Sequence, residues 1–262
     1  MLILTLGCAI NLAEMRSARV LRGGEVHVAQ INSVVVPTAG VRAAIDPAKT
    51  LIDEVGEDDE LSPDEREVLV GGLSAIALTG PGYGTFLDGA VGLGRGWEGG
   101  IRVGNGTYAL SMRRRLLPWQ GPWHGAAGLR WGYSSGGAWF SVLDWANKAV
   151  RVSDLKRMDT AATLTFGREF DEWGRVWWGT KAQVSPYVFE LDGSRVGLAE
   201  ERATGTMFYA GGYAGGAIGW RWVHFAFEFS VLHARGSVDA FGTEHDLSGV
   251  IVAPHWGLQG TF

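Results

Sequence analysis

The stretch Trp220–Leu232, with the sequence WRWVHFAFEFSVL, alternates strictly between two kinds of residue. A period of two is typical of a β-strand with two unlike faces. One face holds His224 and Glu228, and the other holds three successive phenylalanines bounded by valines: Val223, Phe225, Phe227, Phe229 and Val231. Such an apolar face either packs on a protein core or touches lipid, and in the second case the polar face lines an enclosed lumen.

Further alternating stretches run from residue 82 to the end of the chain, and their connections favour a barrel over a sandwich. Short turns (94–96, 118–122, 171–174 and 214–217) alternate with longer polar segments (37–80, 134–156, 191–205 and 233–247). Only Asn105-Gly106, a strong hairpin signal, breaks this order. Membrane barrels have tight turns at one rim and long loops at the other. We therefore expect an all-β chain that forms a closed antiparallel transmembrane β-barrel of about 10 strands, within a range of roughly 8–12.

Composition excludes several classes of protein. The chain has 262 residues, of which 46% are hydrophobic, 40 are glycine, 12 are tryptophan and one is cysteine. The hydrophobic fraction argues against disorder, and the glycines lack the three-residue period of collagen. A formal net charge of −5 without a basic stripe gives no reason to expect nucleic acid as a partner. The chain contains no apolar run of about 18 residues, so we expect no transmembrane helix.

Residues 1–20 are set apart as a signal-like segment, and residues 21–262 are expected to form a single barrel domain. The start of the chain, MLILTLGCAINLA, is apolar and places Cys8 after Leu6-Gly7. This arrangement resembles a bacterial lipoprotein signal, in which the cysteine is lipidated, although a basic start is absent and the segment is short. A buried cysteine in a hydrophobic terminus is the alternative. A lone cysteine cannot form a disulfide within the chain.

Residues 40–62 are polar and acidic, and a helical spacing of apolar residues follows them, so residues 40–80 predict a helical insertion between the first two strands. Ser62-Pro63-Asp64-Glu65 offers a serine N-cap, a proline at the first helical position and a glutamate at the third. Asp46-Pro47 is a second, shorter start signal. The pattern leaves three placements open: the insertion caps one mouth of the barrel, enters the lumen as a plug, or rests on the membrane surface.

The chain ends with VIVAPHWGLQGTF, in which alternate positions are apolar and the last residue is aromatic. This strand resembles the C-terminal signature of bacterial outer-membrane β-barrel proteins, and the general arrangement is more loosely similar to small myxobacterial-type barrels. The resemblance implies the outer membrane of a Gram-negative bacterium, a last strand that closes the barrel against the first, and recognition of that strand by the barrel-assembly machinery. The residues that we expect to face the outer-membrane lipid are Phe225, Phe227, Phe229, Val231, Trp256, Leu258 and Phe262.

The polar faces of the predicted strands carry charges of both signs. The residues expected to line the lumen are Glu98, Arg102, Arg113, Arg115, Arg130, Asp159, Lys181, His224, Glu228 and His255. In a narrow lumen these charges must pair or stay hydrated, because an isolated buried ion is costly. The pattern therefore favours a structural or passive barrel with a salt-bridged lumen.

Two other functions stay open. A basic constriction of Arg102, Arg113, Arg115 and Arg130 would make a narrow anion-preferring pore. A histidine with a carboxylate would suit an outer-membrane lipid-modifying hydrolase or acyltransferase. His224 and Glu228 are roughly 13 Å apart along one strand, and only His255 on a neighbouring strand could approach either.

No catalytic residue, cofactor or metal site is assigned from the sequence. The chain has neither a Gly-x-Ser-x-Gly elbow nor a His-Glu-x-x-His motif, and its possible metal ligands show no usable spacing. Six tryptophans next to the short turns predict an interfacial aromatic girdle: Trp97, Trp119, Trp123, Trp173, Trp177 and Trp178.

Overall fold

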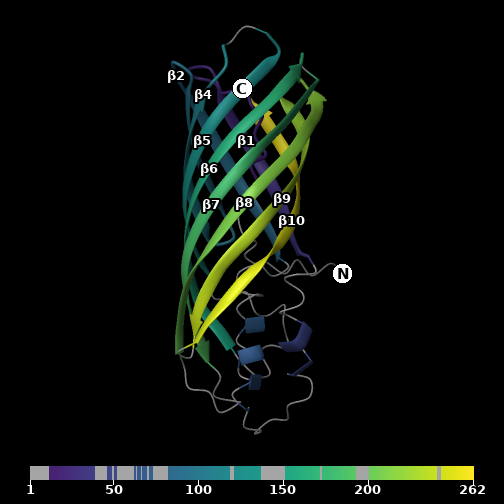
Figure 1. Cartoon of the computed structure of the whole chain (residues 1–262). Helices are drawn as coiled ribbons and strands as arrows, with labels where there is room; N and C mark the ends of the chain where they lie inside the picture. Colours follow the sequence, from purple (N-terminus) through teal and green to yellow (C-terminus); the bar gives the residue numbers. More distant parts are fainter. Residues whose placement is uncertain are drawn as a thin grey trace, which may run out of the picture.

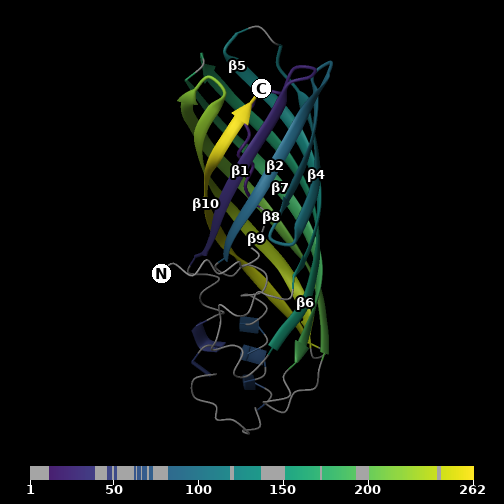
Figure 2. The ribbon, with the colours of Figure 1, turned by 180° about the vertical axis from the view of Figure 1, so that it is seen from behind.

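The computed structural model describes residues 12–38, 46–48, 50–51, 62, 64–65, 67–69, 71–72, 82–118, 121–136, 151–171, 173–192, 201–240 and 243–262. Each strand in these ranges pairs antiparallel with the next along the chain, and the first also pairs with the last (Figures 1 and 2). The expected closed antiparallel barrel is confirmed. Its strands are β1 Val26–Pro37, β2 Gly82–Gly94, β3 Trp97–Gly104, β4 Thr107–Arg115, β5 Trp123–Gly136, β6 Arg151–Phe170, β7 Gly174–Asp192, β8 Glu201–Trp220, β9 Val223–Ala240 and β10 Thr243–Thr261.

The barrel closes where β1 lies between β2 and β10. The β1–β10 register begins at His27↔Thr261 and runs to Pro37↔Ile251. Beyond it, the Val26 N–H donates to the Phe262 carbonyl and the Phe262 N–H donates to the Val26 carbonyl, each over 2.9 Å. The pairing of β1 with β10 gives the backbone N–H and C=O groups of these two strands hydrogen-bond partners. A sheet can cross lipid only when it has no such unpaired edge.

The wall of the barrel is taller on one side than on the other. Strands β1 to β5 contain 8 to 14 residues, whereas β6 to β10 contain 18 to 20. The long strands project past the short ones at the end opposite the C-terminus (Figure 1). The connections β2–β3, β4–β5, β6–β7 and β8–β9 lie at the other end, which we call the turn end.

The polarity of the two faces reverses along β9. From Val223 to Val231 the outward side chains are apolar and 42–55% exposed, and the inward ones are His224, Ala226, Glu228 and Ser230. After Val231 the outward positions include His233, Arg235 and Asp239, and the inward ones are Leu232, Ala234 and Val238. The first zone suits lipid outside, and the second suits water outside.

This reversal explains why two predicted loops were too long. Segments 191–205 and 233–247 were expected to be polar loops, but β7 continues to Asp192, β8 starts at Glu201, and β9 and β10 are interrupted only between Ala240 and Thr243. The outward side chains are polar there because they lie beyond the apolar band. Their polarity therefore does not mark the end of the strand.

The predicted turn at 214–217 was also wrong. Residues Gly215 and Gly216 lie inside β8, and the turn to β9 is Arg221-Trp222, with Arg221 at φ 53°. Gly215 stands opposite Trp177 of β7, and a Cβ atom on it would lie 2.7 Å from the Trp177 indole. Glycine is needed there because it leaves room for a large side chain in the lumen, not because the chain reverses.

The helical insertion is present but small. Within the described residues, helix covers 46–48 and 50–51 in one place and 64–65, 67–69 and 71–72 in another. Ser62 and Glu65 form the predicted capping box, in which the Ser62 N–H donates to Glu65 Oε2 over 2.8 Å. The hydrogen bonds from Ser62 lower the pKa of Glu65. These helical residues lie beyond the ends of β1 and β2, beside the projecting long strands (Figures 1 and 2).

We expect Phe227→Arg to destabilise the folded barrel in lipid vesicles by about 2–4 kcal/mol, because the side chain lies in the middle of the apolar band. Thr204→Arg is the matched control, since Thr204 faces outward opposite Asp239, beyond the band. Urea unfolding followed by tryptophan fluorescence measures both changes. An equal effect of the two substitutions would contradict the assignment of the band to lipid.

Candidate functional site

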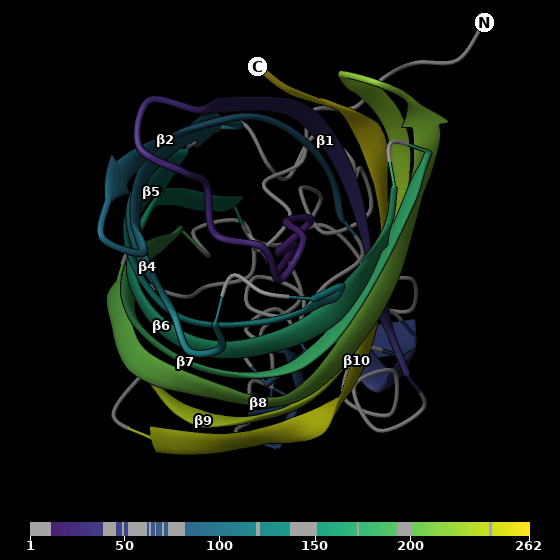
Figure 3. The ribbon, with the colours of Figure 1, turned by 90° about the horizontal axis from the view of Figure 1, so that it is seen from above.

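The lumen is occupied by the chain's own N-terminal segment. Residues 12–22, here called the lumen segment, run inside the ring of strands to the turn end, where Gly23-Gly24 reverses the chain into β1 (Figure 3). Gly24 has φ +88°, and its N–H donates to the Gly92 carbonyl over 3.0 Å. A Cβ atom on Gly92 would collide with the Arg22 carbonyl, so the close passage of the segment past β2 requires glycine.

Carboxylates of the wall accept hydrogen bonds from the backbone of the lumen segment. Glu228 of β9 accepts the N–H of Glu14 over 2.7 Å and that of Met15 over 2.8 Å. It also accepts the indole N–H of Trp177 over 2.8 Å. Glu98 of β3 accepts the N–H of Leu21 over 3.0 Å. Two wall carboxylates thus bind the segment near both of its ends.

Cations of the wall donate to carbonyls of the same segment. Arg113 reaches the Ser17 carbonyl over 2.6 Å. The Ala13 carbonyl accepts from Arg102 and Arg130, and the Leu12 carbonyl accepts from Lys181 over 3.2 Å. The segment forms no regular strand with the wall, so these charged side chains replace the backbone partners that a sheet would supply.

Two side chains of the segment complete the charge pattern. Arg16 lies between Asp88 at 2.6 Å and Glu98 at 3.0 Å. Glu14 lies between Arg130 and Lys181, each at 3.1 Å. The acidic part of the lumen therefore holds the arginine of the segment and the basic part holds its glutamate. This arrangement fixes one register of the segment, because a shift by one residue would leave the buried wall charges without these partners, and a shift by two would bring Glu14 beside Asp88 and Glu98.

An apolar cluster packs around the same segment. Met15 is 1% exposed and clusters with buried side chains of β1, β2, β7, β8 and β9: Ala29, Ile31, Phe86, Trp177, Tyr213, Ala217 and Ala226. Trp177 is also 1% exposed, so the prediction that it belongs to an interfacial girdle was wrong. Its indole reaches inward because Gly215 leaves it space and Glu228 accepts its N–H.

Nine of the ten side chains that we expected in the lumen are buried there: Glu98, Arg102, Arg113, Arg130, Asp159, Lys181, His224, Glu228 and His255. Arg115 is half-buried beside Gly96 at the turn end. His224, Glu228 and His255 have separate partners. His224 accepts from Arg175, Glu228 binds the lumen segment, and His255 lies between Ser33 at 2.8 Å and Ser230 at 3.3 Å.

The seven side chains that we expected to face lipid lie on the outer face or at its end. Phe225, Phe227, Phe229, Val231, Leu258 and Phe262 are 42–63% exposed. Trp256 is half-buried because its ring lies 6.3 Å from that of Tyr83. Cys8 and Trp119 lie outside the described residues.

Reasoning from the sequence missed Glu14 and Arg16, because residues 1–20 were treated as a signal-like segment. The structure has residues 12–20 inside the barrel. The sequence did carry an indication: Glu14 and Arg16 place opposite charges two positions apart, directly after the apolar residues 1–13 and within the range that was set apart as signal-like. Among the described residues, no group of three histidine, cysteine or acidic side chains could hold a metal ion. No helix in the described ranges is long and apolar enough to cross a membrane.

We expect Glu228→Ala to release the lumen segment. The change leaves two backbone N–H groups and one indole N–H without an acceptor, and each costs about 1–3 kcal/mol when buried. Trypsin cleavage after Arg16, which is 8% exposed, measures the release. The wild type should resist cleavage there, and Glu244→Ala, which removes an exposed carboxylate of β10, should resist it equally. Persistent protection of the Glu228→Ala variant would show that Glu228 is not needed to hold the segment.

Comparison with known proteins finds only distant structural similarities. No protein-family model and no curated protein matches the chain. Among solved structures, OprG of Pseudomonas aeruginosa is similar over 94% of this chain and 99% of its own, with 8% identity and a TM-score of 0.41. Neisserial surface protein A (91% and 96% covered, 8% identity, TM-score 0.35) and Ail of Yersinia pestis (92% and 100%, 12%, 0.32) are also similar. At these values the likenesses carry no argument about function. What the chain's own geometry establishes is a closed antiparallel β-barrel with an apolar outer band and an occupied, charged lumen.

Proposed function

We propose that this protein is an integral β-barrel of the bacterial outer membrane with a structural or passive role, and that its own lumen segment closes it. The observation that carries the proposal is the occupancy of the lumen. Residues 12–22 bind wall side chains from β2, β3, β4, β5, β7 and β9 through hydrogen bonds and ion pairs. A lumen occupied by the barrel's own chain favours a structural role over transport.

The membrane location is supported by the outer face. Large apolar side chains on every strand are exposed, including Leu87, Ile101, Leu110, Trp131, Met158, Val184, Phe208 and Ile218. A monomeric soluble protein rarely exposes a contiguous apolar surface on this scale. Charged residues such as Glu98, Arg102, Lys181 and Glu228 lie inside instead, which is the reverse of a soluble barrel and the arrangement that lipid requires.

The orientation follows from the connections. The turn end carries only short connections and Phe262, which is 63% exposed, whereas the longest connections, β1–β2 and β5–β6, join strands at the other end. In outer-membrane barrels the short turns face the periplasm, so we place this end there and the projecting long strands outside the cell. The exposed terminal aromatic of β10 supports recognition by the barrel-assembly machinery. Lipidation of Cys8 stays a prediction.

The anion-pore alternative is less well supported because its proposed constriction is already occupied. Arg102, Arg113 and Arg130 all donate to carbonyls of the lumen segment. Each also has a carboxylate partner: Asp88, Glu98 and Glu14 respectively. These cations therefore bind the segment and not a passing solute.

The enzyme alternative is limited by access. His255 has serine hydroxyls at both ring nitrogens, as a nucleophile–base pair requires, but it is 0% exposed, and Ser33 and Ser230 are 0% and 1% exposed. Glu228 is the register partner of His255, yet its oxygens accept from the lumen segment and Trp177. A substrate cannot reach this group while the segment is in place.

We expect the wild-type protein to give no current steps in planar lipid bilayers, and the double variant Glu14→Lys/Arg16→Glu to give them. The swap puts a lysine beside Arg130 and Lys181 and a glutamate beside Asp88 and Glu98, so both ion-pair groups become repulsive. Single-channel conductance is the measurement.

The matched control is Lys156→Glu/Glu244→Lys, which reverses two exposed charges on the outer face of the projecting strands and leaves the net charge equally unchanged. It should stay silent. Deletion of residues 12–22 should also give steps, with a preference for anions because Arg102, Arg113, Arg130 and Lys181 would then face water. Steady conductance of the wild type would contradict closure by the lumen segment.

A further inference from the structure

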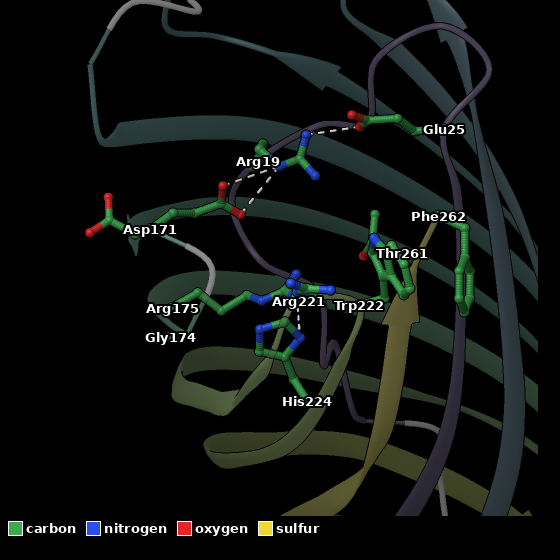
Figure 4. Close-up of a pocket in the computed structure, with 11 residues that line it drawn as sticks. Arg19, Glu25, Asp171, Gly174, Arg175, Arg221, Trp222, His224, Thr261 and Phe262 are labelled. Atoms are coloured by element: carbon green, nitrogen blue, oxygen red, sulfur yellow. Dashed lines mark hydrogen bonds and ion pairs between the residues drawn. The ribbon is translucent and has the colours of Figure 1, made fainter.

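A cavity of about 550 Å³ opens at the turn end, on the side where β7, β8, β9 and β10 meet (Figure 4). It is separate from the ion pairs around Glu14 and Arg16. Among the side chains that line it are Arg175, Arg221, Trp222, His224, Asp171 and Phe262. Its volume falls in the range of roughly 300–1,000 Å³ that is usual for ligand pockets.

Arg175 is the buried cation of this cavity. It is 9% exposed, it extends across the cavity toward His224, and it donates to His224 Nδ1 over 2.9 Å (Figure 4). No carboxylate among the described residues forms an ion pair with it. Arg19, which lines the same cavity, is different because Glu25 at 2.8 Å and Glu169 at 3.2 Å balance its charge. A buried guanidinium is normally paired with an anion, so Arg175 has unused binding capacity.

Arg221 supplies a second cation at the rim. It lies in the β8–β9 turn at φ 53°, and its guanidinium stacks 5.9 Å from the centre of the Trp220 ring. Within the described part of the chain it forms no ion pair. Glu25 and Glu169 are occupied by Arg19, and the Asp171 carboxylate points away from Arg175 (Figure 4). Three guanidinium groups and three carboxylates thus line the cavity, but no carboxylate of this described lining forms an ion pair with Arg175 or Arg221.

The rim beside these arginines is aromatic and exposed. Trp222 is 60% exposed and Phe262 is 63% exposed. Aromatic side chains at this level of a barrel lie among lipid headgroups. An anion that approaches along the membrane surface would thus meet the aromatic rim first and the two guanidinium groups next.

We propose that this cavity is a phosphate-binding site, in which Arg175 and Arg221 bind the phosphate group of a ligand. A guanidinium fork matches phosphate oxygens in a bidentate manner, and a desolvated fork binds more strongly than an exposed one. The phosphate comes either from a phospholipid headgroup of the periplasmic leaflet or from a soluble phosphate compound. The lipid source rests on the proposed membrane location, whereas the site itself does not depend on closure of the lumen.

The test is calorimetric titration of the full-length protein in dodecyl maltoside and phosphate-free buffer. One arm uses inorganic phosphate, and the other uses dihexanoyl phosphatidylglycerol below its micelle concentration. We expect binding in at least one arm. Arg221→Gln and Arg175→Gln should each weaken it roughly tenfold or more, because each removes a charge-assisted contact. Arg175→Lys should weaken binding less than Arg175→Gln does, because lysine keeps the positive charge and lacks only the forked guanidinium.

Arg114→Gln is the matched control. Arg114 is an exposed arginine that stacks 5.0 Å from the centre of Trp97, as Arg221 does on Trp220, but it does not line this cavity. It should bind as the wild type does. Protection of Arg16 from trypsin verifies that each variant is folded, and if Arg175→Gln fails this check, the exposed Arg221→Gln carries the test.

Binding of inorganic phosphate alone would support the site and assign a soluble ligand, and binding of the phospholipid would assign the membrane. The proposal is overturned if neither probe binds, or if Arg221→Gln and the folded variants at Arg175 bind as tightly as the wild type. Conductance of the wild-type barrel would contradict the proposed closure without affecting this result, so the two proposals fail independently.

Discussion

The structure depends on the binding of an irregular peptide by charged side chains inside the barrel. The lumen segment has backbone N–H and C=O groups that no strand pairs with, and leaving them unsatisfied would be costly. Glu228 and Glu98 accept its N–H groups, and Arg102, Arg113, Arg130 and Lys181 donate to its carbonyls. Glu98 and these four cations also form ion pairs with one another or with Asp88, Glu14 and Arg16. The segment and the wall thus satisfy each other's polar groups.

This constraint explains other features of the barrel. A lumen filled by peptide has little room, so glycines on the inner face stand next to the largest inward side chains, as Gly215 does beside Trp177. The polar interior ends where β9 passes Val231, and beyond that level the inner face becomes apolar and the outer face polar. The outer face of this one strand therefore suits lipid along its first half and water along its second.

Alternation of residue types carried most of the fold prediction, and it succeeded where one face is strongly apolar. The phenylalanines of β9 and the terminal aromatic of β10 are visible without a structure. Asn105-Gly106 and Ser62–Glu65 were equally readable, because a φ > 0 turn and a capping box depend on neighbouring residues alone: Asn105 has φ 47° and Gly106 has φ 67°. The projecting strands were misread as loops, since their outward residues resemble those of any solvated connection. The role of Gly215 was misread because its reason lies on another strand.

The sequence by itself determined that apolar and polar residues alternate along the strands and that the apolar faces are too hydrophobic to be exposed to water. It also determined that charges of both signs lie on the opposite faces. Those properties belong to single strands and can be read residue by residue. Only the tertiary structure decided which of several segments enters the lumen and which wall charge meets which atom of it. The reason is physical: Glu14 and Glu228 are 214 positions apart, and their contact exists only after ten strands have closed into a ring. The pairing of Arg175 with His224 and the cavity beside them likewise come from neighbouring turns that closure brings to one rim.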